Sequence, residues 1–321
     1  MNNRSMNNRS RYRIIFMGTP AFAVPSLEMI ARKGHQLLAL FTQPDRINRR
    51  GKGISFSPVK AYGLQNHIPV FQPESLNDKK AQAVIRGMNP DLIVVIAYGR
   101  ILPKAVLDMP AFGCINVHAS LLPEYRGAAP IQRVIMNSEP MTGVTVMKMA
   151  EGMDTGDMIL QKSFVIPPDM TAGALFDSLS RVSASALSEV LDKLPERLGR
   201  AIPQKEEEAT YAEKITKDMS RIQWNQSADR LDALIRGLTP DPGAYTVFRG
   251  KRLKIHEECP SFWNSAEKPG TIISLDEGRL RVQTGRGVID LITVQPENKK
   301  AMTAADFIHG YQVHLYDTFE N

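Results

Sequence analysis

Residues 113–132 read GCINVHASLLPEYRGAAPIQ, an apolar strand that runs into a loop rich in Pro and Gly. Because side chains alternate between the two faces of a strand, Asn116 and His118 point to the same face. An amide beside an imidazole at a strand end can hold two donors over one reacting carbonyl. The stretch therefore suggests a reaction centre, although His118 taken alone fits a structural imidazole at least as well.

Outward from this stretch, apolar runs alternate with helical patterns through the first 195 residues. Strands are predicted at residues 12–17, 36–42, 68–71, 91–97, 113–118, 142–149 and 158–166. Helical spacing between them, and over residues 171–194 up to Pro195, indicates a parallel sheet covered on both faces. We predict an α/β fold of the doubly wound, Rossmann-like type with a mostly parallel sheet. In such folds ligands bind beyond the carboxyl ends of the strands, where Asn116 and His118 lie.

The pattern changes after the long helix. Residues 194–210 are rich in Pro and Glu and have no apolar periodicity, which is typical of a linker. Beyond them, a helix near 228–238 and short runs at 251–256, 270–275, 280–284 and 288–294 indicate a small OB-like β-barrel. We divide the chain into a disordered tail (1–10), a catalytic domain (11–195), a linker (196–209) and a C-terminal domain (210–321).

Composition excludes several classes of protein. Hydrophobic residues make up 43% of the chain and charged residues 23%, as in ordinary globular proteins. No apolar run approaches the roughly 20 residues of a membrane helix, so no membrane association is expected. The two cysteines, Cys114 and Cys259, form no C-x-x-C pattern, which favours a reducing cytoplasm. The histidines lack metal-binding spacing, so we expect no metal.

Positive charge is concentrated in the first part of the chain. Residues 1–205 carry 25 Lys and Arg against 16 Asp and Glu, whereas residues 206–321 carry 15 against 18. The segment 42–60 is long for a connection between a strand and a helix. Its basic residues, opposed by one acid, are Arg46, Arg49, Arg50, Lys52 and Lys60. Such a loop suits a phosphate backbone, and a merely solvated charged loop is the alternative.

Two further segments complete the candidate site. Residues 151–157, EGMDTGD, form a Gly-rich loop in which Asp154 could reach His118 and orient it. Asp157 is a competing candidate, and an Asx turn would explain either residue. Residues 120–123, SLLP, provide a rigid apolar wall of the kind that a flat heterocyclic ligand needs. Gly18-Thr-Pro lacks the G-x-G-x-x-G pattern, so the sequence gives no support for NAD binding.

Taken together, these motifs resemble the folate-dependent formyltransferases, and specifically their tRNA-directed branch. The resemblance extends from residue 11 to about residue 309. It is carried by GTPAFAVPSL (18–27), FTQPDR (41–46), GCINVHASLLPEYRGAAPIQ (113–132), GMDTGDM (152–158), TYAEKI (210–215) and KKAMTAADF (299–307).

The resemblance implies a role for each of these sites. Its catalytic residues fall on Asn116, His118 and Asp154, and its folate-binding residues on Ser120, Leu121, Leu122 and Pro123. Its tRNA-binding loop falls on Arg46, Arg49, Arg50 and Lys52, with Arg50 as the key residue. The implied enzyme is monomeric and moves a formyl group from 10-formyltetrahydrofolate to the α-amine of methionyl-initiator-tRNA. The C-terminal barrel would also bind tRNA, despite its net negative charge.

Two alternatives remain open. The chain could be a folate-dependent formyltransferase or formyl-folate hydrolase acting on a small molecule, because those enzymes share the Asn, His and Asp core. The basic loop and the C-terminal domain argue against this. It could also be a non-catalytic tRNA-binding relative, but the intact set of Asn116, His118 and Asp154 argues against loss of activity.

Overall fold

The computed structural model describes residues 11–47 and 54–320, and these form two compact units. The first unit contains the chain up to Pro130 together with Met141–Val165 and Phe176–Ala212. The second contains Ile131–Pro140, Ile166–Leu175 and Glu213–Asn321, so it includes two short segments from the N-terminal half of the chain. The tail expected at residues 1–10 lies outside the described residues.

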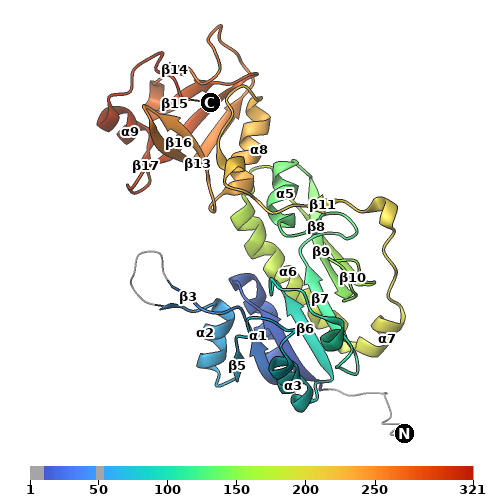
Figure 1. The fold of residues 1–321 in the computed structure, drawn as a ribbon. Coiled ribbons are helices and arrows are strands. Elements are labelled where there is room, and N and C mark those ends of the chain that lie inside the picture. Colours follow the sequence, from blue (N-terminus) through green and yellow to red (C-terminus); the bar gives the residue numbers. More distant parts are fainter. Residues whose placement is uncertain (1–10, 48–53, 321) are drawn as a thin grey trace, which may run out of the picture. The chain divides into compact units, whose positions relative to one another are not determined.

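The first unit is built on a seven-stranded sheet in the order β10-β9-β7-β6-β1-β2-β5 (Figure 1). Its strands are β1 (Arg13–Gly18), β2 (Gln36–Phe41), β5 (Val70–Phe71), β6 (Leu92–Ile96), β7 (Cys114–His118), β9 (Met141–Lys148) and β10 (Met158–Val165). The five strands from β5 to β7 are parallel, β9 pairs with β7 in the antiparallel sense, and β10 pairs in the antiparallel sense with β9. The predicted doubly wound, mostly parallel sheet is confirmed.

Helices of the first unit bury the sheet. They are α1 (Val24–Arg32), α2 (Pro58–Gln65), α3 (Lys79–Met88), α4 (Lys104–Leu107), most of α6 (Ala172–Asp192) and α7 (Leu194–Gly199). All five residues of β6 are buried, as its unbroken apolar sequence predicts. On one face, Val95 and Cys114 pack with Ile85 of α3 and Val106 of α4. Asn116 and His118 lie two and four residues after Cys114 on β7. Because successive side chains of a strand point to opposite faces, all three share this face.

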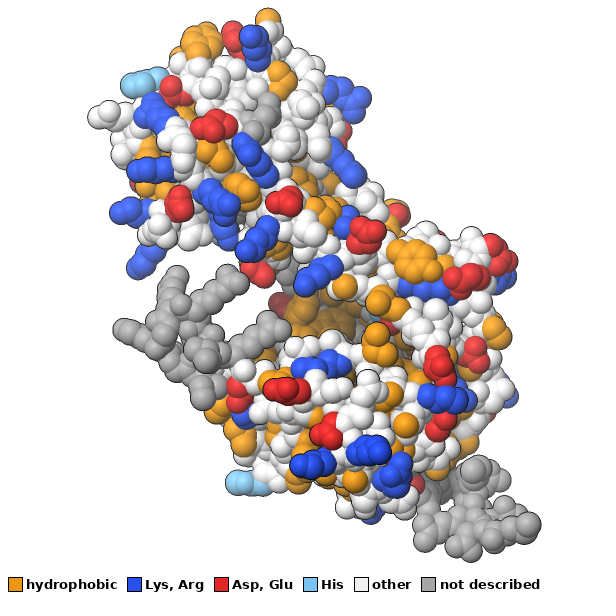
Figure 2. Space-filling view, in the orientation of Figure 1, with side chains coloured by type: hydrophobic (Ala, Val, Ile, Leu, Met, Phe, Trp, Pro, Cys, Tyr) orange, Lys and Arg blue, Asp and Glu red, His pale blue; other side chains and the backbone are white. Residues whose placement is uncertain are grey.

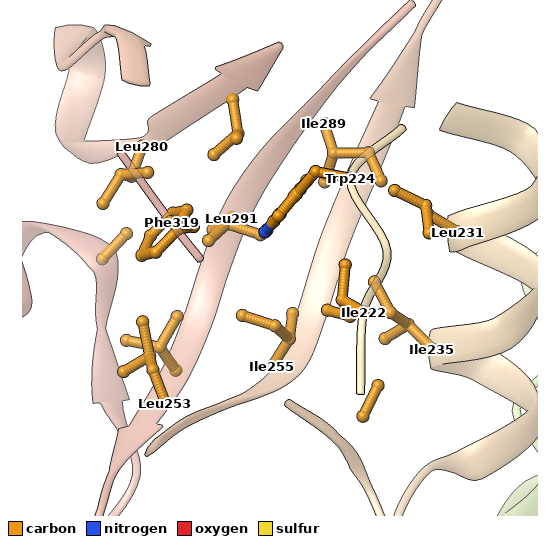
Figure 3. Packing of buried hydrophobic residues seen from close by; sticks show 14 of the residues in the cluster. Ile222, Trp224, Leu231, Ile235, Leu253, Ile255, Leu280, Ile289, Leu291 and Phe319 are labelled. Atoms are coloured by element: carbon orange, nitrogen blue, oxygen red, sulfur yellow. The ribbon is translucent and has the colours of Figure 1, made fainter. Parts of the chain in front are cut away.

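The second unit is a six-stranded antiparallel half-barrel. Its strands are β12 (Ala244–Phe248), β13 (Lys251–Ser261), β14 (Ile272–Ser274), β15 (Leu280–Gln283), β16 (Val288–Pro296) and β17 (Met302–Thr303). They pack with α8 (Ala228–Leu238) and α9 (Ala304–Tyr311), and α5 (Pro130–Met136) contributes Met136 to the same core. Figure 3 shows Trp224 inside this core, where its indole Nε1 donates to Thr246 Oγ1 at 3.0 Å. The predicted small β domain is thus confirmed, in the form of a half-barrel.

The segment expected to be a linker has local structure. Helix α7 extends into it, and the 3₁₀ turn η2 (Glu206–Glu208) lies further along. Directly after it, β11 (Tyr211–Ala212) pairs in parallel with β8 (Arg126–Gly127). The segment up to Ala212 belongs to the first unit. Across the described residues, no helix is long and apolar enough to cross a membrane.

Candidate active site

Asn116 and His118 lie at the carboxyl end of β7, as predicted. The Asn116 side chain is half-buried, and among the described residues it has no hydrogen-bond partner, so its amide N–H groups remain available. His118 is buried, and its Nε2 lies 2.9 Å from the carbonyl oxygen of Tyr125. A carbonyl only accepts, so Nε2 carries a proton and donates it. The other ring nitrogen is thereby turned towards the Gly-rich loop.

Asp154 is the carboxylate that this loop brings to His118. Its Oδ2 lies 3.6 Å from His118 Nδ1 and accepts a hydrogen bond of 3.0 Å from the backbone N–H of Gly127. Asp154 adopts a left-handed backbone conformation with φ of 56°. At Gly156, an added Cβ would lie 1.7 Å from the carbonyl oxygen of Lys148, so only glycine fits there. Asp157 is exposed, and within the described chain the carboxylate that lies near the His118 imidazole is that of Asp154.

The loop of Ser120, Leu121, Leu122 and Pro123 is held from within. The Ser120 hydroxyl is buried and donates to the carbonyl of Glu124 at 2.6 Å. Thr145 on β9 accepts from the Leu122 N–H at 3.0 Å and donates to the Ser120 carbonyl at 2.7 Å. These bonds rigidify the loop, and they leave Leu121 and Pro123 as its partly exposed side chains.

A cavity of about 260 Å³ lies where β7 begins, and Asn116, His118 and Asp154 are not among its lining residues. Its lining residues are Lys104, Leu107, Asp108, Gly113, Cys114, Lys148, Met149, Ala150 and Glu151. Cys114 lies two residues before Asn116 on β7, and burial raises the pKa of its thiol to about 12. The thiol is therefore a neutral, largely apolar group in the cavity wall. At the rim, Lys104 pairs with Asp108 at 3.3 Å and with Glu151 at 3.5 Å.

Residues near the two ends of the basic segment 42–60 bind one another. The hydroxyls of Thr42 and Ser57 lie 2.7 Å apart, and Lys60 forms a close ion pair with Asp45. Strands β3 (Arg46–Ile47) and β4 (Ile54–Ser55) then pair as a hairpin. Arg49, Arg50 and Lys52 lie outside the described residues, and of Arg46 only the backbone is described.

The chain matches two family models along most of its length. Residues 12–191 match the formyl transferase family, and residues 214–312 match the formyl transferase C-terminal domain. A methionyl-tRNA formyltransferase from Caldanaerobacter subterraneus subsp. tengcongensis is 48% identical, over 94% of this chain and 97% of the relative. Another from Alkaliphilus oremlandii is 45% identical, over 93% of this chain and 96% of the relative. The chain belongs to the methionyl-tRNA formyltransferase family.

Solved structures agree on the fold of this family member. HypX from Aquifex aeolicus, solved with tetrahydrofolic acid, superposes with a TM-score of 0.67 at 16% identity. The match covers 95% of this chain, which spans about half of HypX (48%). An N-formyltransferase from Helicobacter canadensis, solved with folinic acid and dTDP-3-aminofucose, gives a TM-score of 0.65 at 17% identity. That match covers 88% of this chain and 99% of the other.

The sequence did not point to every residue that shapes this site. Thr145 could not have been found, because its role depends on the antiparallel register that places it opposite His118. Within the described chain, no group of three or more His, Cys, Asp or Glu is arranged to hold a metal ion.

Proposed function

We propose that the chain transfers the formyl group of 10-formyltetrahydrofolate to the α-amino group of methionyl-initiator-tRNA. The observation that carries the proposal is the approach of Asp154 to His118, which shares the end of β7 with Asn116. Membership of the family supports the reaction, and tetrahydrofolate in the HypX structure supports folate as the donor for a fold of this kind.

The chemistry is acyl transfer without an enzyme nucleophile. An α-amine has a pKa near 8, so its neutral form is present at neutral pH and can attack the formyl carbon. The new bond joins that carbon to the amine nitrogen, and the bond to N10 of the folate breaks. The amine loses a proton, and N10 gains one. The catalytic task is therefore to stabilise the oxyanion of the tetrahedral intermediate.

Asn116 supplies a hydrogen-bond donor for this oxyanion. A protonated His118 would supply positive charge near it, because its two ring nitrogens face the Tyr125 carbonyl and Asp154. The Asn116 amide is free of other bonds among the described residues. A proton on His118 Nδ1 would point towards Asp154, whose carboxylate stabilises the positively charged imidazolium. We assign Asp154 the further task of exchanging protons through water as N10 leaves. Preorganised donors of this type contribute roughly 10²–10³ in rate each.

The folate donor is expected against the loop of Ser120, Leu121, Leu122 and Pro123, with contact made through the partly exposed Leu121 and Pro123. This loop follows His118 directly after the carboxyl end of β7, so a folate held there would have its formyl group near Asn116 and His118.

Two basic surfaces would receive the tRNA. The first is expected to be the basic segment 42–60, with Arg46, Arg49, Arg50 and Lys52. The second lies in the C-terminal unit, where Lys251, Arg252, Lys299 and Lys300 form no ion pair within the described chain. The N–H of Glu297 donates to the Arg252 carbonyl, which brings their two turns side by side. Figure 2 shows Lys and Arg side chains gathered on this unit, so a locally basic face is compatible with its net acidity.

One assay separates this function from its alternatives. The protein is incubated with 10-formyltetrahydrofolate and either charged initiator or charged elongator methionyl-tRNA. We expect formyl-methionine on the initiator alone. Equal formylation of both would refute the specificity. Loss of formyl donor without tRNA would indicate a hydrolase, and no product of any kind would indicate a non-catalytic tRNA-binding protein. The proposed enzyme is a cytoplasmic monomer.

A further inference from the structure

The segment after α7 makes direct hydrogen bonds to the loop that carries Asp154. The Nε2 atom of Gln204 donates to the carbonyl oxygen of Asp154 at 2.8 Å and to that of Gly156 at 2.7 Å. One amide group therefore uses both of its hydrogens to hold two carbonyls on either side of Thr155. Next to Gln204, Ile202 exchanges two backbone hydrogen bonds with Met158, where the loop ends.

Arg126 determines which way the Gln204 amide faces. Its Nε donates to Gln204 Oε1 at 3.0 Å. Arginine has no acceptor, so the oxygen of the amide must point to Arg126 and the NH₂ group to the Asp154 loop. The Arg126 side chain is 1% exposed, and its Nη1 contacts both carboxylate oxygens of Glu206, at 3.0 and 2.8 Å. The buried guanidinium is thus paired and fixed in place.

The same short strand holds the other end of Asp154. Gly127, which follows Arg126 on β8, donates its N–H to Asp154 Oδ2. Strand β8 is in turn paired with β11, directly after the segment that carries Gln204. The backbone and the carboxylate of Asp154 are therefore held by one structure, made of residues 126–127 and 202–212.

Such support matches the backbone conformation of Asp154, which has a φ of 56°. Sparsely populated backbone conformations of this kind persist only where the surroundings over-determine them. A carboxylate must also be held to within a fraction of an ångström to act on an imidazole, and a displacement of about 1 Å can cost on the order of 10²-fold in rate.

We propose that Gln204, oriented by Arg126 and Glu206, is a positioning residue that holds Asp154 against His118. The inference rests on the proposed function, because it assigns to the supposed linker a part in the reaction at that site. Gln204 touches no reacting atom. It acts through the loop, so its loss should lower kcat much more than it changes the affinity for tRNA.

The test is a double-mutant cycle of Gln204→Ala and Asp154→Asn, with kcat and KM measured on methionyl-initiator-tRNA. We expect Gln204→Ala to lower kcat about 10- to 100-fold, with KM for tRNA within about twofold of wild type. In the Asp154→Asn background, the same change should lower kcat by no more than about twofold, because the residue through which it acts is already disabled. Glu207→Gln, an exposed neighbour in η2, is the matched control and should leave kcat unchanged.

A second variant, Gln204→Glu, tests whether the loss of activity is only a consequence of lost folding. An ionised carboxylate keeps the shape of the amide but donates nothing to the two carbonyls, so it should lower kcat like alanine while the melting temperature stays close to wild type. Wild-type kcat in either Gln204 variant would overturn the inference and leave the proposed function intact. An additional tenfold loss in the Asp154→Asn background would also overturn it. Wild-type kcat for Asp154→Asn alone would overturn both the inference and the catalytic role of Asp154.

Discussion

Glu258→Gln should change how the stability of the C-terminal unit depends on pH. Glu258 lies on β13, and burial and the nearby charge of Asp232 raise the pKa of its carboxyl to about 8. Arg236 binds Asp232 through three contacts of 2.7–3.0 Å, and the positive charge of Arg236 offsets part of the rise in the pKa of Glu258. In the unfolded chain Glu258 releases its proton near pH 4.5.

The sign follows from these two values. Between about pH 4.5 and 8 the folded unit holds a proton that the unfolded chain has released, so stability falls as pH rises. The full slope is about 1.4 kcal/mol per pH unit for one proton. Allowing for the part of Glu258 that stays in contact with water, we expect a loss on the order of 2 kcal/mol between pH 5.5 and 7.5. Glutamine resembles the protonated acid and does not titrate, so Glu258→Gln should lack this loss.

The two tryptophans of the chain, Trp224 and Trp263, make the measurement selective. Both belong to the second unit, so their fluorescence during urea unfolding reports on that unit. Wild type and Glu258→Gln should have similar free energies of unfolding at pH 5, and the variant should be the more stable at pH 7.5. Glu257→Gln, an exposed neighbour bonded to Thr293, is the control and should follow wild type. An equal fall in stability for wild type and Glu258→Gln between pH 5.5 and 7.5 would refute the reasoning.

Three further predictions concern catalysis. Alanine at Asn116, His118 or Asp154 should each lower kcat by at least about 10², with little change in KM for tRNA, and steady-state kinetics on purified variants would expose any residue that is dispensable. Arg50→Ala should weaken tRNA-dependent turnover and flatten its salt dependence, so a variant whose kcat/KM equals that of wild type at both low and high salt would remove this segment from the tRNA contact. Gly156→Ala should displace the Asp154 loop, because its Cβ would lie 1.7 Å from a backbone oxygen. The value of kcat should fall about 10²-fold at near-constant melting temperature. Full activity of this variant would contradict the rigidity inferred for the loop.

Much of the fold could be predicted because burial leaves a direct mark on the sequence. The run at residues 91–97 contains β6, all of it buried, and the short runs after residue 250 became the half-barrel. Strand β12 (AYTVF) was missed, although its residues favour a strand and alternate between buried and partly buried positions. The β8–β11 pair was missed because each strand has only two residues, and the two lie about 85 residues apart in the chain.

The parts of the site that depend on neighbouring residues in the sequence could be predicted, and the parts that depend on contacts between distant segments could not. Asn116 and His118 follow from the alternation of one strand. The backbone conformation decides that Asp154, and not Asp157, lies near His118. It depends on the left-handed φ of Asp154 and on Gly156, where a side chain would clash with the backbone. Gln204 was hidden in a stretch without apolar pattern, because its function depends on hydrogen bonds and not on burial. Absence of hydrophobic periodicity therefore does not mark a segment as a passive tether.

The discontinuous make-up of the second unit has a consequence for dissecting this protein. A fragment cut at residue 210 would look like an intact module by sequence, yet it would lack part of its own core. Met136 packs there against the helix α8, Arg230 binds the Met136 carbonyl at 3.1 Å, and Arg236 binds the carbonyl of Met170 at 3.2 Å. The two halves of the gene product are therefore not separable by a single cut, and a boundary drawn from family alignment is not a boundary at which the chain can be divided.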